Sequence, residues 1–249
     1  MEMQTYGHGV PSWVDVGTDV DKAKDFYRAL FGWDIPDGPP EAGGYSIAFL
    51  RGKTVAGVGP QMNPGPPVWS AYVNVDDADA IAEKVTANGG QVVLAPMDVM
   101  TAGRMAFFAD PAGAVFGIWQ AGDHKGAQLV NEPGTFGWSE LVTTDMEGAK
   151  AFYHAVFGWG AETHGDYTEW KLGDRSIGGG MPKPAEMPAE VPPYWGVYFV
   201  VEDTDATVAK VNELGGSLIF GPVDIEPGRF ATVADSTGAM FNVLAMKAG

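Results

Sequence analysis

The chain of 249 residues contains no cysteine. This absence excludes disulfide bonds, thiolate nucleophiles and thiolate metal sites. Basic residues are also scarce, because 15 lysines and arginines stand against 32 aspartates and glutamates, which gives a net charge of −17. Such a charge repels phosphate backbones and anionic lipids, so we expect neither nucleic acid nor a membrane as a partner.

Long apolar runs are missing as well. The first residues, MEMQTYGHGVPSW, lack the basic and apolar regions of a signal peptide. No later run approaches the roughly 18 apolar residues that a membrane-spanning helix needs. We therefore expect a cytoplasmic protein. The hydrophobic content of 45% suffices for a sizeable core, and the length suits two domains of roughly 120 residues each.

The most informative feature that is present is a stretch that occurs twice. The sequence AKDFYRALFGW begins at Ala23 and AKAFYHAVFGW begins at Ala149, and 149 − 23 = 126 residues separate them. In each copy the apolar residues recur at the spacing of one face of an amphipathic helix, and a glycine follows where the helix ends. The repeat predicts that the chain consists of two copies of one module.

The order of predicted elements around each copy is also the same. Each half reads as a strand, a helix and further strands, and this succession is passed through twice. We predict a first domain at 1–122, a linker at 123–133 and a second domain at 134–249. In this register Trp138 and Glu140 take the places of Trp13 and Asp15.

These motifs together resemble a known superfamily. The helix that ends in Phe-Tyr-x-x-x-Phe-Gly-Trp, the later Val-x-Asp-x-Asp and the closing Asp-Pro-x-Gly turn resemble the vicinal-oxygen-chelate group of glyoxalases, bleomycin-resistance proteins and extradiol dioxygenases. The sequence is most similar to two-domain glyoxalase-like proteins of actinobacteria, some of which are labelled hydroxylase. The resemblance implies an α+β fold of two tandem domains, each a pair of βαβββ units that form a half-open barrel around a ligand cavity.

The metal-dependent members of this superfamily carry histidine or glutamate ligands at three strand positions that face the cavity. By register with the family, those positions fall at residues of other types: Trp13 (or Ser12), Ser70 and Gly117, then Trp138, Gly196 and Asn242. The four histidines lie elsewhere, at His8, His124, His154 and His164. A catalytic divalent site needs about three converging ligands, so we expect no metal and no cofactor.

Asp15 and Glu140 are the candidate catalytic residues. Each shares a strand face with a tryptophan, so its carboxyl group is predicted to point into the cavity. There it could accept a hydrogen bond from a ligand, or act as a general base whose pKa is raised by burial. Alternatively each is a structural acid paired with Arg104, Arg229 or a backbone amide.

The candidate ligand-binding residues are mostly aromatic. Trp13, Trp138, Tyr72 and Tyr198 could line a pocket for a flat molecule, or could pack the barrel interior or the domain interface. The remaining ligand-binding candidates are polar.

Arg104 and Arg229 could clamp an anionic group, or could form structural ion pairs. Asn242 could orient a substrate oxygen, whereas its counterpart Gly117 leaves extra space in the first domain.

The function predicted from this resemblance and from the aromatic cavity is the binding of a small aromatic or polyketide-like organic molecule, as in the drug-resistance branch. The alternative is a metal-independent hydroxylase, oxygenase, lyase or isomerase in which Asp15 or Glu140 removes a proton. A third possibility is an interaction protein whose cavities are filled by tryptophan. We expect a monomer whose halves pair as an internal pseudo-dimer, or a homodimer.

Overall fold

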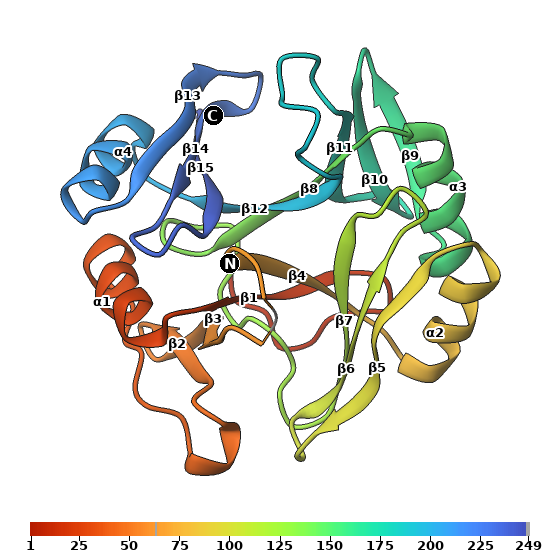
Figure 1. Cartoon of the computed structure of the whole chain (residues 1–249), viewed down its shortest axis with the longest axis horizontal. Coiled ribbons are helices and arrows are strands. Elements are labelled where there is room, and N and C mark those ends of the chain that lie inside the picture. The colour runs from red at the N-terminus through yellow and green to blue at the C-terminus, as the bar shows by residue number, and fades with distance from the viewer. Residues whose placement is uncertain (63, 248–249) are drawn as a thin grey trace.

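The computed structural model describes residues 1–62 and 64–247. Asn63 and residues 248–249, the end of the predicted second domain, lie outside the described residues. Within this part the chain forms an α+β protein of two similar halves, as the repeat and the resemblance predicted (Figure 1). The first half contains β1 (Pro11–Thr18), α1 (Val20–Phe31), the short 3-10 helix Pro40–Ala42, β2 (Ser46–Leu50), β3 (Lys53–Pro60), β4 (Val68–Asn74), α2 (Ala78–Ala87), β5 (Gln91–Val99), β6 (Gly103–Ala109) and β7 (Val115–Ala121). The second half contains β8 (Phe136–Thr143), α3 (Met146–Phe157), β9 (Gly160–His164), β10 (Tyr167–Leu172), β11 (Arg175–Pro182), β12 (Tyr194–Val200), α4 (Thr204–Glu213), β13 (Ser217–Asp224), β14 (Gly228–Ala234) and β15 (Met240–Met246).

Each half folds its strands into one curved sheet. In the first half the order is β2, β3, β1, β4, β7, β6, β5, and in the second it is β9, β10, β11, β8, β12, β15, β14, β13. The first strands of the paired units lie side by side and antiparallel, β1 against β4 and β8 against β12. A single parallel pair, Met240 with Val68, joins the two sheets. The inner face of each sheet is defined below as the face that carries Asp15 or Glu140.

Helix α1 shows why the repeated sequence folds as predicted. Asp19 caps its start, since the side chain accepts from the backbone N–H of Lys22. Gly32 ends it in the left-handed conformation, with φ of 70°. The apolar spacing buries Phe26 and Tyr27 on one side, and helix α3 repeats the arrangement with Asp145 and Gly158 as its caps.

The first βαβββ unit, which begins with β1, lacks one strand that the other three units have. After α3 the chain forms β9 directly, but after α1 the same place holds only a single bridge between Asp34 and Phe49. Pro36, Pro39 and Pro40 follow at once. Proline has no N–H to give to a sheet ladder, so the strand cannot extend here.

The apolar cores cross the boundary between the halves. One core packs Tyr27 and Trp33 of the first half with Phe199 and Phe241 of the second. The other packs the α3 aromatic residues against Phe116 of the first half. Accordingly α1 lies beside α4, and α2 beside α3, at opposite sides of the molecule (Figure 1). None of the helices in the described residues is long and apolar enough to cross a membrane.

Candidate functional site

Asp15 lies on the inner face of the first sheet and is held by two tyrosines. The hydroxyls of Tyr72 and Tyr45 donate to its Oδ2 atom at 2.9 Å and 3.1 Å. The indole N–H of Trp13 donates in turn to the Tyr45 hydroxyl at 3.0 Å. No donor to Oδ1 is present in the described part of the chain. One carboxylate oxygen is thus fixed, while the other keeps its capacity to accept a hydrogen bond.

Glu140 repeats this arrangement in the second sheet. The Tyr198 hydroxyl donates to its Oε1 atom at 2.8 Å, and the Tyr167 hydroxyl stands over Gly179, the strand partner of Glu140. The Trp138 indole donates to the Tyr167 hydroxyl at 2.9 Å. The structure therefore brings the predicted residues Trp13, Asp15 and Tyr72 together, and likewise Trp138, Glu140 and Tyr198.

Glycines on the neighbouring strand make room for the additional tyrosines. Gly57 pairs with Asp15 and Gly179 pairs with Glu140 across the parallel ladders. A Cβ atom on either glycine would overlap the hydroxyl of Tyr45 or Tyr167. These glycines therefore admit a tyrosine ring over the backbone.

Burial tunes the acidity of these groups. It raises the pKa of Asp15 to about 6, although the hydrogen bonds from Tyr72 and Tyr45 act in the opposite direction. Burial likewise raises the pKa of Glu140, against the hydrogen bonds from Tyr198 and Tyr167. The pKa of Tyr72 is itself raised by burial and by the charge of Asp15, so its hydroxyl keeps its proton and remains a donor.

Apolar side chains continue the inner face away from each carboxylate. In the second domain Tyr198, Phe230 and Phe220 form a row, with ring centroids 6.1 Å and 5.9 Å apart. Phe220 is 56% exposed, although it is a large aromatic residue. In the first domain Phe107 contacts Tyr72 with a centroid distance of 5.2 Å, and Leu94, its strand partner, is 37% exposed. An exposed apolar row beside a buried carboxylate is typical of a ligand surface.

A linker residue covers the inner face of the first domain. The His124 ring meets the Trp13 ring edge-on at 4.4 Å between centroids and lies 5.7 Å from that of Trp119. The Trp119 indole donates to the His124 carbonyl at 2.8 Å. Burial lowers the pKa of His124 to about 4. Sequence analysis assigned His124 only to the linker.

The two arginines do not reach either carboxylate, so the alternative in which Asp15 or Glu140 pairs with Arg104 or Arg229 is wrong. Arg104 forms ion pairs with Asp79 of α2 and with Asp98, at 2.9 Å and 3.0 Å. Arg229 pairs in the same way with Asp205 of α4 and with Asp224, at 2.6 Å and 3.1 Å. Both side chains lie on the helix side of their sheets, where they form structural ion pairs. They are therefore not placed to clamp a ligand on the inner face. The partners of Asp15 and Glu140 are tyrosines.

Asn242 is buried, and its amide is used within the protein. Its Oδ1 atom accepts from the Thr232 hydroxyl at 2.6 Å, and Nδ2 donates to the Val197 carbonyl at 3.4 Å. Its counterpart Gly117 does not leave open space, because a Cβ there would overlap the ring of Tyr72. The expectation of a roomier first cavity at Gly117 is therefore wrong, since a tyrosine ring occupies that space.

The donor set on the inner face does not fit a metal of the family type. Across the strands, Trp13 pairs with Tyr72 and Tyr72 with Gly117, while Trp138 pairs with Tyr198 and Tyr198 with Asn242. Ser70 and Gly196 pair instead with Asp15 and Glu140. Each inner face thus offers one carboxylate among phenols and indoles. No cluster of three or more His, Cys, Asp or Glu residues that could hold a metal ion occurs in residues 1–62 and 64–247.

A separate hollow of about 310 Å³ lies near the N-terminal segment and contains none of these residues. It is lined by Thr5, Tyr6, Asn74, Val75, Asp76, Gln120, Ala121 and Lys125. Its principal polar groups are already bonded within the protein: Asn74 Nδ2 donates to the carbonyls of Tyr6 and Gly7, and Gln120 Oε1 accepts from the Ala78 amide. We therefore place the candidate site on the inner faces.

Sequence reasoning missed Tyr45 and Tyr167, which complete the two sites. Each opens or precedes a short strand that gives no functional signal of its own. The available signal was the pair of glycines at i and i+2 on the next strand, Gly57 and Gly59, which stand against the Tyr45 ring. Such spacing indicates that a bulky side chain lies across the strand.

The fold and this arrangement define a tandem glyoxalase-like protein. The chain belongs to the glyoxalase/bleomycin resistance protein/dioxygenase superfamily, whose family model matches residues 15–118 and 135–243. The resemblance seen in the sequence is thereby confirmed.

Two curated relatives span nearly the whole chain. It is 47% identical to "Putative glyoxylase CFP32" of Mycobacterium tuberculosis (strain CDC 1551), over 96% of this chain and 95% of that protein. It is 39% identical to the anthracycline biosynthesis protein DnrV of Streptomyces peucetius, over 99% of this chain and 97% of that protein.

Solved structures share the fold at low identity. The Mn(II)-bound glyoxalase of Novosphingobium aromaticivorans has a TM-score of 0.65 at 16% identity, over 96% of this chain and 83% of that one. The 2,3-dioxygenase LapB of Pseudomonas sp. KL28 has a TM-score of 0.65 at 12% identity, over 96% of this chain and 93% of that one. Both likenesses concern the fold alone.

Proposed function

We propose that the protein binds a small, flat aromatic molecule bearing a hydroxyl group, on the inner face of its glyoxalase-like sheet. The observation that carries the proposal is a partly buried carboxylate held by tyrosine hydroxyls beside a tryptophan, two at Asp15 and one at Glu140. The ligand hydroxyl donates to the carboxylate, and the aromatic row receives its rings.

The charges around the site favour a hydrogen-bond donor over an anion. Arg104 and Arg229 lie on the helix side of the sheets and are paired there. The cations of these ion pairs therefore lie away from the carboxylate on the inner face. The chain as a whole carries a net charge of −17. An anionic ligand would be repelled, whereas a phenol would relieve the cost of burying the carboxylate.

The relatives support the same class of ligand. DnrV is named for anthracycline biosynthesis, and an anthracycline is a polycyclic aromatic polyketide with phenolic hydroxyls. A molecule of this kind matches the row of Tyr198, Phe230 and Phe220 in shape and the carboxylate in chemistry. Binding without chemistry, as in sequestration, needs nothing further from the protein.

A second candidate function, metal-independent catalysis, is favoured by one observation. Burial raises the pKa of Asp15 to about 6, and raises that of Glu140 as well. A general base works best when its pKa lies near the operating pH. In this case the carboxylate takes a proton from an acidic C–H or O–H group of the ligand, and the electron pair of that bond stays on the ligand.

The test measures the binding of a dihydroxyanthraquinone by fluorescence quenching and by native mass spectrometry. Its dimethyl ether, which keeps the rings and lacks the hydroxyl donors, is the matched control ligand. We expect the diol to bind and the ether to bind about tenfold more weakly, the loss of a charge-assisted hydrogen bond. Equal affinity for both, or binding of neither, would contradict the proposal.

Substitution of the carboxylates separates binding from catalysis. Glu140→Gln and Asp15→Asn keep a carbonyl acceptor for the tyrosines and remove the charge and the base. Sequestration predicts that the ligand is recovered unchanged by liquid chromatography and mass spectrometry, with a modest loss of affinity in the variant. Catalysis predicts a product that the wild type forms and the variant, still binding, does not form. The wild type and the variants are each measured with and without a chelator.

A further inference from the structure

The two inner faces are not equally accessible, although their hydrogen-bond networks match. Trp13 is 3% exposed, whereas its counterpart Trp138 is partly exposed. His124 covers Trp13 at 4.4 Å between ring centroids. Trp138 has no comparable ring neighbour in the described residues. The difference lies in what covers the tryptophan, because both indoles donate to a tyrosine in the same way.

The segment that carries His124 is fixed in place over the first domain. The His124 amide donates to the Ala102 carbonyl at 3.0 Å, and its own carbonyl accepts from the Trp119 indole at 2.8 Å. Trp119 lies on the inner face, since it alternates with Gly117, which stands against the Tyr72 ring. The imidazole Nε2 is buried and has no hydrogen-bond partner. The ring therefore serves as an apolar filler between two indoles.

The second domain differs at the corresponding positions. Leu244 stands where the first domain has Trp119, and its side chain has no N–H that could hold a covering segment. Tyr194 stands where the first domain has Val68. Its ring lies against Gly196, the strand partner of Glu140, and burial and the charge of Glu140 raise the pKa of its hydroxyl. It has no hydrogen-bond partner in the described part of the chain.

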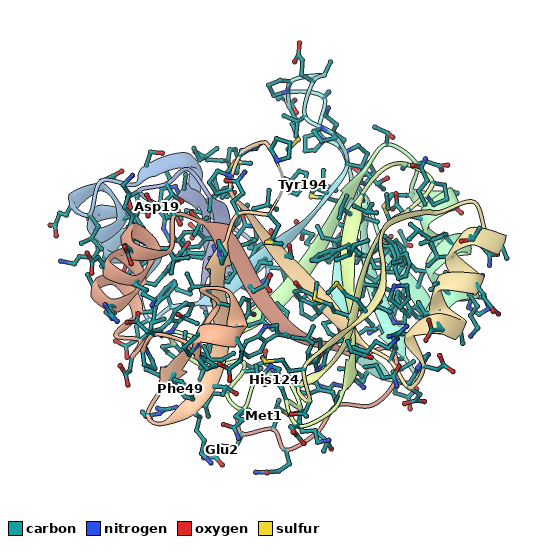
Figure 2. The ribbon with its side chains drawn as sticks, turned by 60° about the horizontal axis from the view of Figure 1, so that its bottom comes forward. Met1, Glu2, Asp19, Phe49, His124 and Tyr194 are labelled. Atoms are coloured by element: carbon teal, nitrogen blue, oxygen red, sulfur yellow. The ribbon has the colours of Figure 1, made fainter. Side chains whose placement is uncertain are left out.

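Figure 2 labels His124 and Tyr194 and shows them in opposite halves of the view, one low in the picture and one high. Tyr194 follows a long proline-rich connection between β11 and β12. It shares the inner face with Gly196 and Tyr198, because alternate residues of a strand lie on the same side. Gly196 is the strand partner of Glu140.

We propose that each chain has a single working ligand site, built on Glu140, Tyr194 and Tyr198 in the second domain, and that His124 fills the equivalent place in the first. This inference rests on the proposed function and goes beyond it by naming the domain, the stoichiometry and a specificity residue. Tyr194 offers its free hydroxyl to an oxygen of the ligand, while Glu140 receives the ligand hydroxyl. The ligand class is thus an aromatic molecule with a donor and an acceptor oxygen next to each other.

The stoichiometry tests this assignment directly. Native mass spectrometry of the wild-type chain with 1-hydroxyanthraquinone, whose hydroxyl and carbonyl are adjacent, is expected to show one ligand per chain. His124→Gly removes the filler and is expected to add a second, weaker ligand. Tyr194→Phe is expected to weaken the wild-type site about three- to tenfold. Two ligands on the wild type, or one ligand unaffected by Tyr194→Phe, would overturn the assignment.

A measurement without ligand keeps the inference testable if no anthraquinone binds. Oxidative footprinting read peptide by peptide is expected to modify Trp138 several-fold faster than Trp13 in the wild-type chain. His124→Gly is expected to raise the rate at Trp13 and leave that at Trp138 unchanged, with near-ultraviolet circular dichroism as the check on folding. Equal rates in the wild type would overturn the inference. Failure of binding together with unequal rates would overturn the proposed function and leave the covering role of His124 standing.

Discussion

The hydroxyl of Tyr27 in the first domain donates a hydrogen bond of 2.7 Å to Oδ2 of Asp235 in the second. The pairing is reciprocal, because the hydroxyl of Tyr153 in the second domain donates to Oδ2 of Asp110 in the first at 3.1 Å. The other oxygen of Asp235 holds its own turn by accepting from the Ala239 amide at 3.0 Å. One aspartate in each domain thus fixes a local turn and also binds the helix of the other domain.

Tyr27→Phe tests this connection. The change leaves Oδ2 of Asp235 without its donor and the Trp69 indole without its acceptor, which is 2.8 Å away in the wild type. We expect the free energy of unfolding to fall by about 1–3 kcal/mol, the usual cost of an unsatisfied buried polar group. Urea unfolding measures it. Tyr153→Phe is the matched variant and should lose a similar amount, and a loss near zero in both would show that the bonds contribute nothing to stability.

The fold was predictable from the sequence because its signals are local and written twice. The apolar spacing around Phe26, the cap at Asp19 and the glycine at Gly32 each depend on a few neighbouring residues. The partner of Tyr27 was not predictable, since Asp235 lies 208 residues away. Repetition indicates that two halves are alike, and it does not indicate which residues of one half meet the other.

The candidate site was predicted in part for the same reason. Asp15 and Trp13 share a strand, so alternation alone places them on one face. Tyr45 belongs to a different strand pair and reaches Asp15 only because Gly57 leaves room. His124 was assigned to the linker because no local pattern shows that a connecting segment folds back over a tryptophan.

The glycines beneath the two tyrosines give a second prediction. Gly57→Ala places a Cβ atom where the Tyr45 hydroxyl lies, so we expect the ring to move and its bond to Asp15 to be lost. Gly17→Ala is the matched control, because its Cβ would meet the nearest atom at an ordinary 3.7 Å. The tyrosine ring resonances in an NMR spectrum report the change. A spectrum that shifts equally in both variants would contradict the role given to Gly57.

The arginine ion pairs give a third prediction. Arg104 and Arg229 bind carboxylates of α2 and α4 and lie on the helix side of the sheets. We therefore expect Arg104→Gln and Arg229→Gln to leave the dissociation constant of an aromatic ligand within about twofold of the wild type. Titration at low and high salt checks this. A large loss of affinity in either variant would place an arginine in the ligand site after all.

The carboxylate of Asp15 predicts how stability changes with pH. Burial raises its pKa from the ordinary value of 3.8 to about 6 in the folded protein. The folded state therefore binds the proton more tightly, and this contribution to stability is present below pH 4 and is lost as the pH rises towards 6. We therefore compare the free energy of unfolding of Asp15→Asn with that of the wild type at each pH. We expect this difference to favour the variant more at pH 7 than at pH 4, by on the order of 2 kcal/mol. Urea unfolding at a series of pH values measures the difference, and a difference independent of pH would contradict it.

His124 should act with the opposite sign. Its pKa is about 4 in the folded protein, lowered from 6.5 by burial. The unfolded chain therefore binds the proton more tightly, so the stability present above pH 6.5 is lost as the pH falls through this range to about 4. Because Asp15 gains stability over part of the same range, the wild-type curve alone conceals both effects. The difference in the free energy of unfolding between the wild type and His124→Gln isolates the histidine. We expect the wild type to lose on the order of 2 kcal/mol relative to His124→Gln between pH 7 and pH 4. If that difference stays constant, the imidazole is solvated and titrates normally, and it does not fill the space between Trp13 and Trp119.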